Sequence, residues 1–363
     1  MKILYLLFSF TTGGTERLVT DICNEMAARG HDIHLYVVND HYDQSMLDGL
    51  DSRVQVALQK RRPGGGGKLE TLQRIAEYIR RHGIEVVHCN SLAAPELLLL
   101  KPVCYPKVRI IHTVHDVGQY GTLGKGKVAL RNWLCHRIVA ISDCVHRDIV
   151  SHGAAAEKVV TVYNAIDLTR FQGELDPVRE DGEIRIGNVA RIMPEKKGQD
   201  VLIRAVARLH GRYPQLRCYF AGEADAAHQT HLDGLKQLAG KLEVTDSVTF
   251  LGNVKDVPGF LASLDVFVLP SRYEGFGISL LEAMAMGVPC IASRLDGPAE
   301  ILCDGIYGEL FPCGDDEALA RKLEKVLSDL EKYRREAADN MAHIRDTYDI
   351  RHMCDQLTMV YLS

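Results

Sequence analysis

Short apolar runs alternate with amphipathic patterns from the first residues of the chain onward. In the first half the strand-like runs are residues 3–8, 33–38, 86–89 and 110–114. Helical patterns at residues 16–29 and 69–81 are followed by Gly30 and Gly83, each placed where a left-handed C-cap belongs. Such alternation predicts an α/β fold, with a parallel sheet covered by helices.

The same rhythm restarts after a polar stretch that follows residue 170. Strand-like runs recur at residues 184–189, 217–220, 248–251, 266–269 and 289–292, and helical patterns at 199–210, 228–242, 257–263, 279–286, 315–329 and 331–359. A chain of 363 residues lets each half bury its own core. We therefore predict two Rossmann-like domains, at residues 1–170 and 184–345, joined by a hinge at residues 171–183. Residues 346–363 are predicted to form a helical tail that packs on the first domain.

Composition limits the classes of protein that remain. The ten cysteines form no Cys-x-x-Cys pair and no zinc-spaced cluster, so we expect no structural metal and a reducing, cytoplasmic setting. No run approaches the roughly 20 apolar residues that span a bilayer. Residues 1–170 carry a net charge of +4 and residues 171–363 one of −9. The basic half fits either an ordinary solvated face or a surface that meets an anionic membrane or acceptor.

Gly13 and Gly14 lie between the first strand and the first helix. Unpaired amides and the helix dipole favour negative charge at such a position, although a tight turn alone would explain the glycines. The spacing differs from the Gly-x-Gly-x-x-Gly fingerprint, so a nicotinamide cofactor is disfavoured.

A second strand-to-helix loop, residues 191–198, carries Arg191, Lys196 and Lys197. These cations are either solvated or placed to stabilise the charge of a departing diphosphate.

The most specific segment is residues 270–282, which leads from a strand through a glycine turn into a helix. Two carboxylates, Glu274 and Glu282, flank amides at 277–280 that we expect to face a phosphate, and Ser279 is expected to cap the helix. A role for Glu282 in stabilising the helix dipole alone is the less favoured alternative. Carboxylates in this setting fit sugar and ribose hydroxyls better than a metal ion.

His112 and His115 close the strand at 110–114. Strand alternation places them on opposite faces, so His112 reads as a packed core residue and His115 as the better candidate for contact with a sugar or acceptor.

Together these segments resemble the family 4 retaining glycosyltransferases, along nearly all of the chain. That family has the GT-B fold, in which two Rossmann-like domains face each other across a cleft and the C-terminal helix crosses back to the first domain. Residues 164–167 are similar to the Asn-Gly-Ile-Asp segment of the family, with Ala165 in place of glycine. Other departures from the pattern are Glu223-Ala224-Asp225 after Gly222, and Gly297-Pro298 before Glu300.

The resemblance implies the roles of individual residues. It makes His115, Glu274, Arg191 and Lys197 catalytic, with Lys196 as the alternative to Lys197. It assigns donor-sugar contacts to Glu274 and ribose contacts to Glu282. The implied donor-binding set is Gly13, Gly14, Arg191, Lys197, Glu223, Val254, Glu274, Gly275, Phe276, Gly277, Ile278, Ser279 and Glu282.

The expected function is transfer of a hexose from a nucleotide-diphosphate sugar to a glycan or lipid-linked acceptor in cell-surface polysaccharide or glycolipid synthesis. A UDP-sugar is favoured over GDP-mannose, and neither a cofactor, a metal nor a nucleic acid is expected. The basic residues 60–68 and 124–131 are candidates for peripheral contact with an anionic membrane at its inner face. Alternatives are a nucleotide-sugar epimerase and a non-catalytic nucleotide or carbohydrate binder.

Overall fold

The computed structural model describes residues 1–62, 67–172, 182–224 and 229–363. It divides into two compact units: unit 1 comprises Met1–Ala165 and Ile350–Ser363, and unit 2 comprises Ile166–Asp349. The chain therefore leaves unit 1 after Ala165 and returns to it at Ile350, whereas the sequence-based division used residues 170 and 346.

Unit 1 is built on seven parallel strands among the described residues, in the order β3-β2-β1-β4-β5-β6-β7. The strands are β1 (Lys2–Leu7), β2 (Asp32–Asn39), β3 (Gln55–Arg61), β4 (Val86–Cys89), β5 (Arg109–Val114), β6 (Arg137–Ala140) and β7 (Val159–Thr161). Most of their side chains are buried because helices cover both faces, which explains the near-continuous apolar runs.

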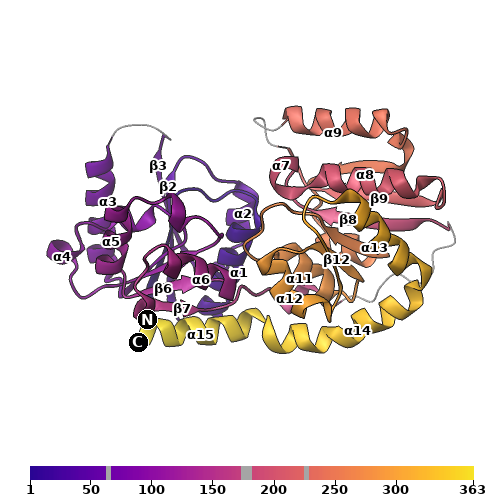
Figure 1. Ribbon diagram of the computed structural model, residues 1–363. Coiled ribbons are helices and arrows are strands. Elements are labelled where there is room, and N and C mark those ends of the chain that lie inside the picture. Colours follow the sequence, from indigo (N-terminus) through magenta and orange to yellow (C-terminus); the bar gives the residue numbers. More distant parts are fainter. Residues whose placement is uncertain (63–66, 173–181, 225–228) are drawn as a thin grey trace. The chain divides into compact units, whose positions relative to one another are not determined.

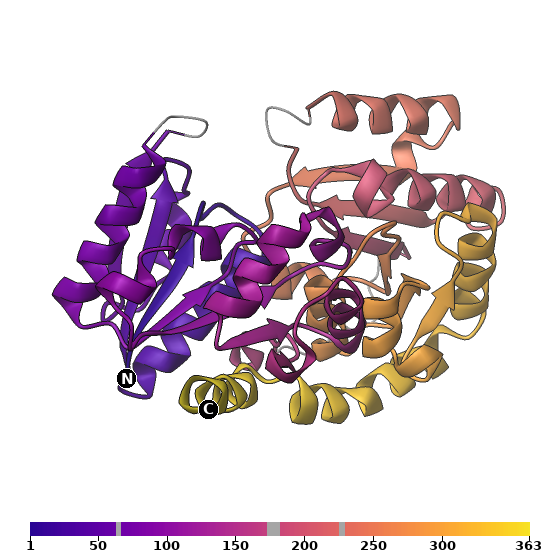
Figure 2. The same ribbon diagram turned by 60° about the vertical axis from the view of Figure 1, so that its left-hand side comes forward.

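The helices of unit 1 are α1 (Gly14–Ala28), α2 (Gln44–Asp48), α3 (Lys68–His82), α4 (Lys101–Cys104), α5 (Lys125–Leu134), α6 (Asp143–Ser151) and α15 (Ile350–Leu362), with a short 3₁₀ segment η1 (Ala94–Leu97). The connections β1–α1–β2 and β3–α3–β4 run in opposite directions across the sheet, so right-handed crossovers place α1 and α3 on opposite faces. Helix α15 packs on α1, and α4 packs on α3 (Figures 1 and 2).

A buried polar network fastens α15 to the sheet. The Tyr361 hydroxyl lies 2.7 Å from His88 Nδ1 and 3.0 Å from the Tyr5 hydroxyl. His88 Nε2 lies 2.6 Å from the Thr113 hydroxyl, and Arg109 donates to the Tyr361 carbonyl at 2.6 Å. The C-terminal helix is thereby part of the core of unit 1.

Unit 2 repeats the plan with six parallel strands among its described residues, in the order β10-β9-β8-β11-β12-β13. They are β8 (Ile184–Val189), β9 (Leu216–Ala221), β10 (Val248–Gly252), β11 (Val266–Leu269), β12 (Cys290–Ser293) and β13 (Glu309–Phe311). The helices are α7 (Pro194–Lys197), α8 (Gln199–His210), α9 (Gln229–Lys241), α10 (Val257–Ala262), α11 (Ile278–Ala285), α12 (Asp296–Ile301), α13 (Asp316–Ser328) and α14 (Leu330–Thr347). The predicted α/β fold of two Rossmann-like domains is confirmed.

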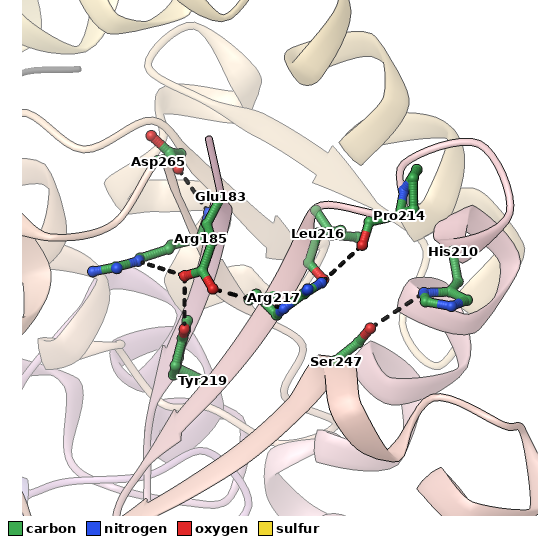
Figure 3. Close-up of polar contacts among 9 residues, drawn as sticks. All are labelled: Glu183, Arg185, His210, Pro214, Leu216, Arg217, Tyr219, Ser247 and Asp265. Atoms are coloured by element: carbon green, nitrogen blue, oxygen red, sulfur yellow. Dashed lines mark hydrogen bonds and ion pairs between the residues drawn. The ribbon is translucent and has the colours of Figure 1, made fainter. Parts of the chain in front are cut away.

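At the amino-terminal edge of the unit 2 sheet, carboxylates lie close to arginine side chains (Figure 3). Glu183 accepts from Arg185 at 3.1 Å and from Tyr219 at 3.2 Å, and it lies 3.8 Å from Arg217. Asp265 accepts from the Arg185 amide at 2.7 Å. Each arginine at this edge therefore has a carboxylate close by.

Candidate functional site

Two loops of unit 2 are joined at the carboxyl edge of its sheet, where β8 and β11 end side by side. The amides of Arg272 and Tyr273 donate to the Lys196 carbonyl at N···O distances of 2.8 and 3.3 Å. Gly198 has a φ of +66°, and a Cβ there would lie 1.9 Å from the Pro270 carbonyl oxygen. Only glycine permits this close approach, so the loop of cations is held against the loop of carboxylates.

Lys197 and Glu274 meet across this junction. The Lys197 ammonium lies 2.8 Å from Glu274 Oε2, which also accepts from the Ser271 hydroxyl at 3.2 Å. Lys197 is thus the residue of the lysine pair that reaches Glu274, while Lys196 joins the loops through its backbone. An ammonium has three donors, so Lys197 can hold Glu274 and a phosphate oxygen at once.

Arg272 forms a bracket that the sequence did not reveal. Its guanidinium makes two parallel bonds to the carboxylate of Asp200 in α8, at 2.7 and 2.8 Å, and a third to the Pro194 carbonyl at 2.6 Å. Planar bidentate pairing fixes orientation as well as distance. Because Asp200 and Pro194 flank Lys197, the bracket positions the lysine relative to Glu274.

Arg191 follows β8 and has an exposed side chain, and the part of the chain that the structure describes contains no carboxylate paired with it. Its carbonyl accepts from the Gln199 amide at 2.8 Å. The neighbouring loops after β9 and β10 are tied in by backbone bonds, from Ile192 to Glu223 at 3.0 Å and from Gly222 to Gly252 at 2.8 Å. Glu223 and Val254 therefore belong to the same edge of the sheet.

Helix α11 begins beside Glu274 with no side-chain cap. Gly277 has a φ of +116°, and its carbonyl accepts from Leu280 and Leu281 at 3.0 and 3.2 Å. The prediction that Ser279 caps this helix is wrong, because the helix starts at Ile278 and Ser279 lies inside its first turn. The Leu280 amide donates to the Gly277 carbonyl, so it is not available to a phosphate. The amides of Ile278 and Ser279 have no acceptor in the described ranges, and these two remain the candidates for contact with a phosphate.

The other predicted donor-binding residues of this segment, Phe276, Gly275 and Glu282, differ in how deeply they are buried and in what they pack against. The Phe276 side chain is buried, and its ring packs at 5.9 Å from that of Tyr348, so it belongs to the core. Gly275 lies against α12, where a Cβ on Gly297 would be 2.7 Å from the Gly275 carbonyl oxygen. Glu282 is half-buried in α11, close to the start of the helix.

Unit 1 carries the other predicted residues, at the carboxyl edge of its own sheet. Gly13 is the N-cap of α1 and Gly14 its first residue, and no side chain caps this end. The Gly13 carbonyl accepts from the Arg17 amide at 2.9 Å. Gly13 and Gly14 follow β1, and His115 follows β5, with β4 between these strands.

His115 has buried ring nitrogens for which the described residues supply no hydrogen-bond partner. Burial lowers its pKa to about 4, against the opposing charge of Asp116. The imidazole is therefore neutral at physiological pH and can both donate and accept. His112 is fully buried, its pKa is lowered by burial and by the Arg131 charge, and its ring stacks on Tyr120 at 6.3 Å.

The predicted basic contact at residues 124–131 is wrong for Arg131. This side chain is fully buried, donates to the Leu92 and Lys127 carbonyls, and pairs with Glu96, which also pairs with Lys127. Of the other predicted basic segment, residues 63–66 lie outside the described residues.

The described residues offer neither a metal site nor a membrane span. They contain no group of three or more His, Cys, Asp or Glu residues placed to hold a metal ion. None of their helices is both long enough and apolar enough to cross a bilayer.

Comparison with known proteins agrees with this layout. The model of glycosyl transferases group 1 matches residues 176–342, and that of Glycosyltransferase Family 4 matches residues 12–170. N-acetyl-alpha-D-glucosaminyl L-malate synthase of Bacillus anthracis is 28% identical over 355 residues, which cover 89% of this chain and 87% of that protein. Phosphatidyl-myo-inositol mannosyltransferase of Mycobacterium tuberculosis is 30% identical over 305 residues, which cover 80% and 77%.

Solved structures share the fold. Anabaena Alr3699/HepE in complex with UDP has a TM-score of 0.85 at 22% identity, with 99% of both chains covered. WaaG, a glycosyltransferase involved in lipopolysaccharide biosynthesis, has a TM-score of 0.76 at 19% identity, with 98% of both chains covered.

Proposed function

We propose, from the premise that this chain belongs to the family 4 glycosyltransferases, that it moves a hexose from a nucleoside-diphosphate sugar to a glycan or lipid-linked acceptor with retention of anomeric configuration and without a divalent metal. Membership makes it a glycosyltransferase with the GT-B fold. The donor, the stereochemistry, the independence from a metal and the acceptor are proposed.

One observation carries the proposal. Lys197 and Glu274 meet at 2.8 Å beside the uncapped start of α11, so a cation, a carboxylate and helix amides share one edge of the unit 2 sheet. A diphosphate suits the amides and the cation, and a sugar hydroxyl suits the carboxylate. The amino end of a helix and fixed cations stabilise the negative charge that grows on a departing diphosphate.

In the proposed reaction, the bond between the anomeric carbon and the diphosphate oxygen breaks as the bond to the acceptor oxygen forms on the same face. The acceptor proton passes to a phosphate oxygen, and the nucleoside diphosphate leaves. Arg191, Lys197 and the amides of Ile278 and Ser279 offset its charge. Glu274 holds the sugar, and neutral His115 offers a hydrogen bond to sugar or acceptor.

Names of similar proteins support the substrate classes. Anabaena Alr3699/HepE was solved with UDP and with UDP-glucose, which favours a UDP-sugar for this chain. A Rhizobium meliloti relative is named a lipopolysaccharide core mannosyltransferase, and the mycobacterial relative acts on a phosphatidyl-inositol, so acceptors bound to membranes are favoured. We infer that the enzyme works in the cytoplasm and reaches a membrane from there.

A donor screen followed by transfer tests the proposal. UDP-glucose, UDP-galactose, UDP-N-acetylglucosamine and GDP-mannose are compared by thermal shift, because a ligand that binds the native state raises the Tm by mass action. The stabilising donor is then incubated in radiolabelled form with lipid extracts, with and without a chelator, and the anomer of the product is determined by NMR. Absence of a shift with every donor, isomerisation in place of transfer, loss of transfer with chelator, or an inverted product would each contradict its part of the proposal.

A further inference from the structure

The amino-terminal edge of the unit 1 sheet carries four half-buried cations: Lys101, Arg109, Arg137 and Lys158, here called the edge cluster. Arg109 and Arg137 begin β5 and β6, Lys158 immediately precedes β7, and Lys101 begins α4. None of the four pairs with a carboxylate among the described residues. Each donates to a backbone carbonyl instead: Lys101 to Pro106 at 3.3 Å, Arg109 to Tyr361 at 2.6 Å, Arg137 to His136 at 3.0 Å and Lys158 to Cys135 at 2.9 Å.

The four cations surround one imidazole. His136 lies between the strands, where its Nδ1 accepts from the Ile110 amide at 3.1 Å. Burial, and next the charges of Lys101, Lys158, Arg109 and Arg137, lower the pKa of His136 to about 4. The edge cluster is thus a concentration of positive charge and not four separate residues.

The arginines at the amino-terminal edge of the unit 2 sheet are paired with a carboxylate. There Arg185 and Arg217 lie at the starts of adjacent strands, and both approach Glu183 (Figure 3). Strands β8 and β9 occupy the sheet positions of β1 and β2 in unit 1, where Lys2 likewise lies 3.3 Å from Asp32. The cations at the amino ends of β5 to β7 have no such carboxylate among the described residues. The edge cluster leaves positive charge available to an external anion.

Two exposed apolar side chains flank the edge cluster. Trp133 is 63% exposed, and the carbonyl of the preceding Asn132 accepts from Lys158. Val103 is 86% exposed and lies in α4, two residues after Lys101. An exposed indole and an aliphatic side chain beside cations are typical of surfaces that rest in the headgroup region of a membrane.

We propose that the edge cluster, with Trp133 and Val103, binds the anionic surface of a lipid bilayer. A free phosphate would use the cations but leave both apolar side chains in water, whereas a bilayer accepts both kinds of group. This inference deepens the proposed function, on which it rests for the location of the acceptor. Of the predicted contact at residues 124–131, only Arg131 is excluded, by its burial.

The length of the strands then sets the distance between the bilayer surface and the carboxyl edge of the sheet, where His115 lies. The edge cluster lies at the amino ends of strands whose carboxyl ends carry His115, and six residues of β5 span roughly 20 Å at ~3.3 Å per residue. The reactive hydroxyl of a lipid-linked acceptor would project about that far from the bilayer.

The chain contains its own probe, because Trp133 is its only tryptophan. The full-length protein is titrated with vesicles of phosphatidylcholine and phosphatidylglycerol at low and high salt. We expect a blue shift of Trp133 emission and quenching by brominated lipid, both weaker at high salt and absent with pure phosphatidylcholine. The double variant Lys101→Gln/Arg137→Gln should bind roughly 30-fold more weakly, the factor expected for two cations at a membrane surface.

Matched controls separate this site from general charge. The variant Arg53→Gln/Arg321→Gln loses two exposed cations that have carboxylate partners, and it should bind as the wild type does. Val103→Ser keeps the probe and should reduce both the blue shift and the affinity. An unchanged emission with anionic vesicles, equal losses in the two double variants, or an equal response to polyglutamate or inorganic phosphate would overturn the proposal.

Transfer is measured in parallel with a detergent-solubilised acceptor. Retained transfer by Lys101→Gln/Arg137→Gln, with lost vesicle binding, supports the proposal. A wild-type protein that binds vesicles but transfers no sugar would refute the proposed function and leave the membrane site standing.

Discussion

Lys196 and Lys197 are adjacent lysines with different tasks. The Lys197 side chain lies 2.8 Å from Glu274, while the Lys196 carbonyl joins the two loops. A substitution at Lys196 keeps that carbonyl. Comparing substitutions at the two positions therefore shows which ammonium group stabilises the diphosphate.

We expect Lys197→Ala to lower kcat/KM by about 10² to 10³, the range for loss of one donor to a developing negative charge. Lys196→Ala should change it by no more than a few-fold. Steady-state kinetics with the identified donor measure both. Equal losses, or a larger loss at Lys196, would reverse the assignment.

Buried histidines make unit 1 sensitive to acid. Burial lowers the pKa of His88 to about 3 and that of His115 to about 4, from an ordinary value near 6.5. Below pH 6.5 these histidines are protonated in the unfolded chain but remain neutral in the native state, until the pH reaches their lowered pKa values. The contribution of these residues to stability is therefore complete above about pH 6.5 and declines as the pH falls toward 4 and then 3.

Each such histidine should reduce the free energy of unfolding by about 1.4 kcal/mol per pH unit within its window. Urea denaturation followed by Trp133 emission at pH 7 and at pH 5 reports on unit 1, where the tryptophan lies. The variant His88→Gln should lose less stability over this interval than the wild type. A pH dependence identical to that of the wild type would show that His88 is protonated in the native state.

At the scale of elements, the bracket of Arg272 and Asp200 joins the loop after β11 to α8. It touches neither reacting group directly, so its effect on catalysis must pass through the position of Lys197. Arg272 is therefore a positioning residue.

Arg272→Lys retains the charge but cannot make the planar pair. We expect it to lower kcat/KM roughly tenfold or more, nearly as much as Arg272→Ala does, because a hydrogen bond to a charged group contributes about 1.5–3 kcal/mol. Asp200→Asn should resemble them. Arg204→Lys, on the same helix, serves as the control. Full rescue by lysine would mean that charge alone suffices at position 272.

Elements with strong local signals were predictable, and those defined by distant partners were not. The runs at 184–189 and 266–269 and the helix at 199–210 coincide with β8, β11 and α8, because apolar periodicity and the glycine before α8 mark them. Strands β6, β7 and β13 were not predicted from the sequence, although β4 and β11, which are no longer than β6, were. The helical tail was expected to be continuous, but it breaks between α14 and α15, where Ile166 donates to the Tyr348 carbonyl at 3.0 Å.

The site divides in the same way. Glu274 and the glycine turn are visible in the sequence because they lie within one short segment. The Arg272 bracket joins residues 72 positions apart, and no local pattern indicates such a pair. Likewise, the burial of Arg131 depends on the Leu92 carbonyl and Glu96, far earlier in the chain.

At the scale of the whole molecule, α15 returns the end of the chain to unit 1. Its Tyr361 hydroxyl bonds both His88 and Tyr5 inside the core, so removal of that oxygen leaves buried polar groups without partners.

Tyr361→Phe should lower the free energy of unfolding of unit 1 by about 1–3 kcal/mol, the cost of such unpaired groups. Tyr273→Phe, at an exposed position of unit 2, is the control. Urea curves followed by Trp133 emission compare the two. No loss in Tyr361→Phe would indicate that water replaces the hydroxyl.

The path of the chain makes unit 2 an insertion into unit 1, since residues on both sides of it complete one fold. A deletion after Ala165 would discard the helix that completes its hydrophobic interior. Ile166 and Asp349 pair as a parallel bridge, so the two ends of the insertion lie next to each other. A short glycine linker from Ala165 to Ile350 could therefore close the gap and yield the first unit as a free-standing protein, with every residue of its lipid-facing edge retained.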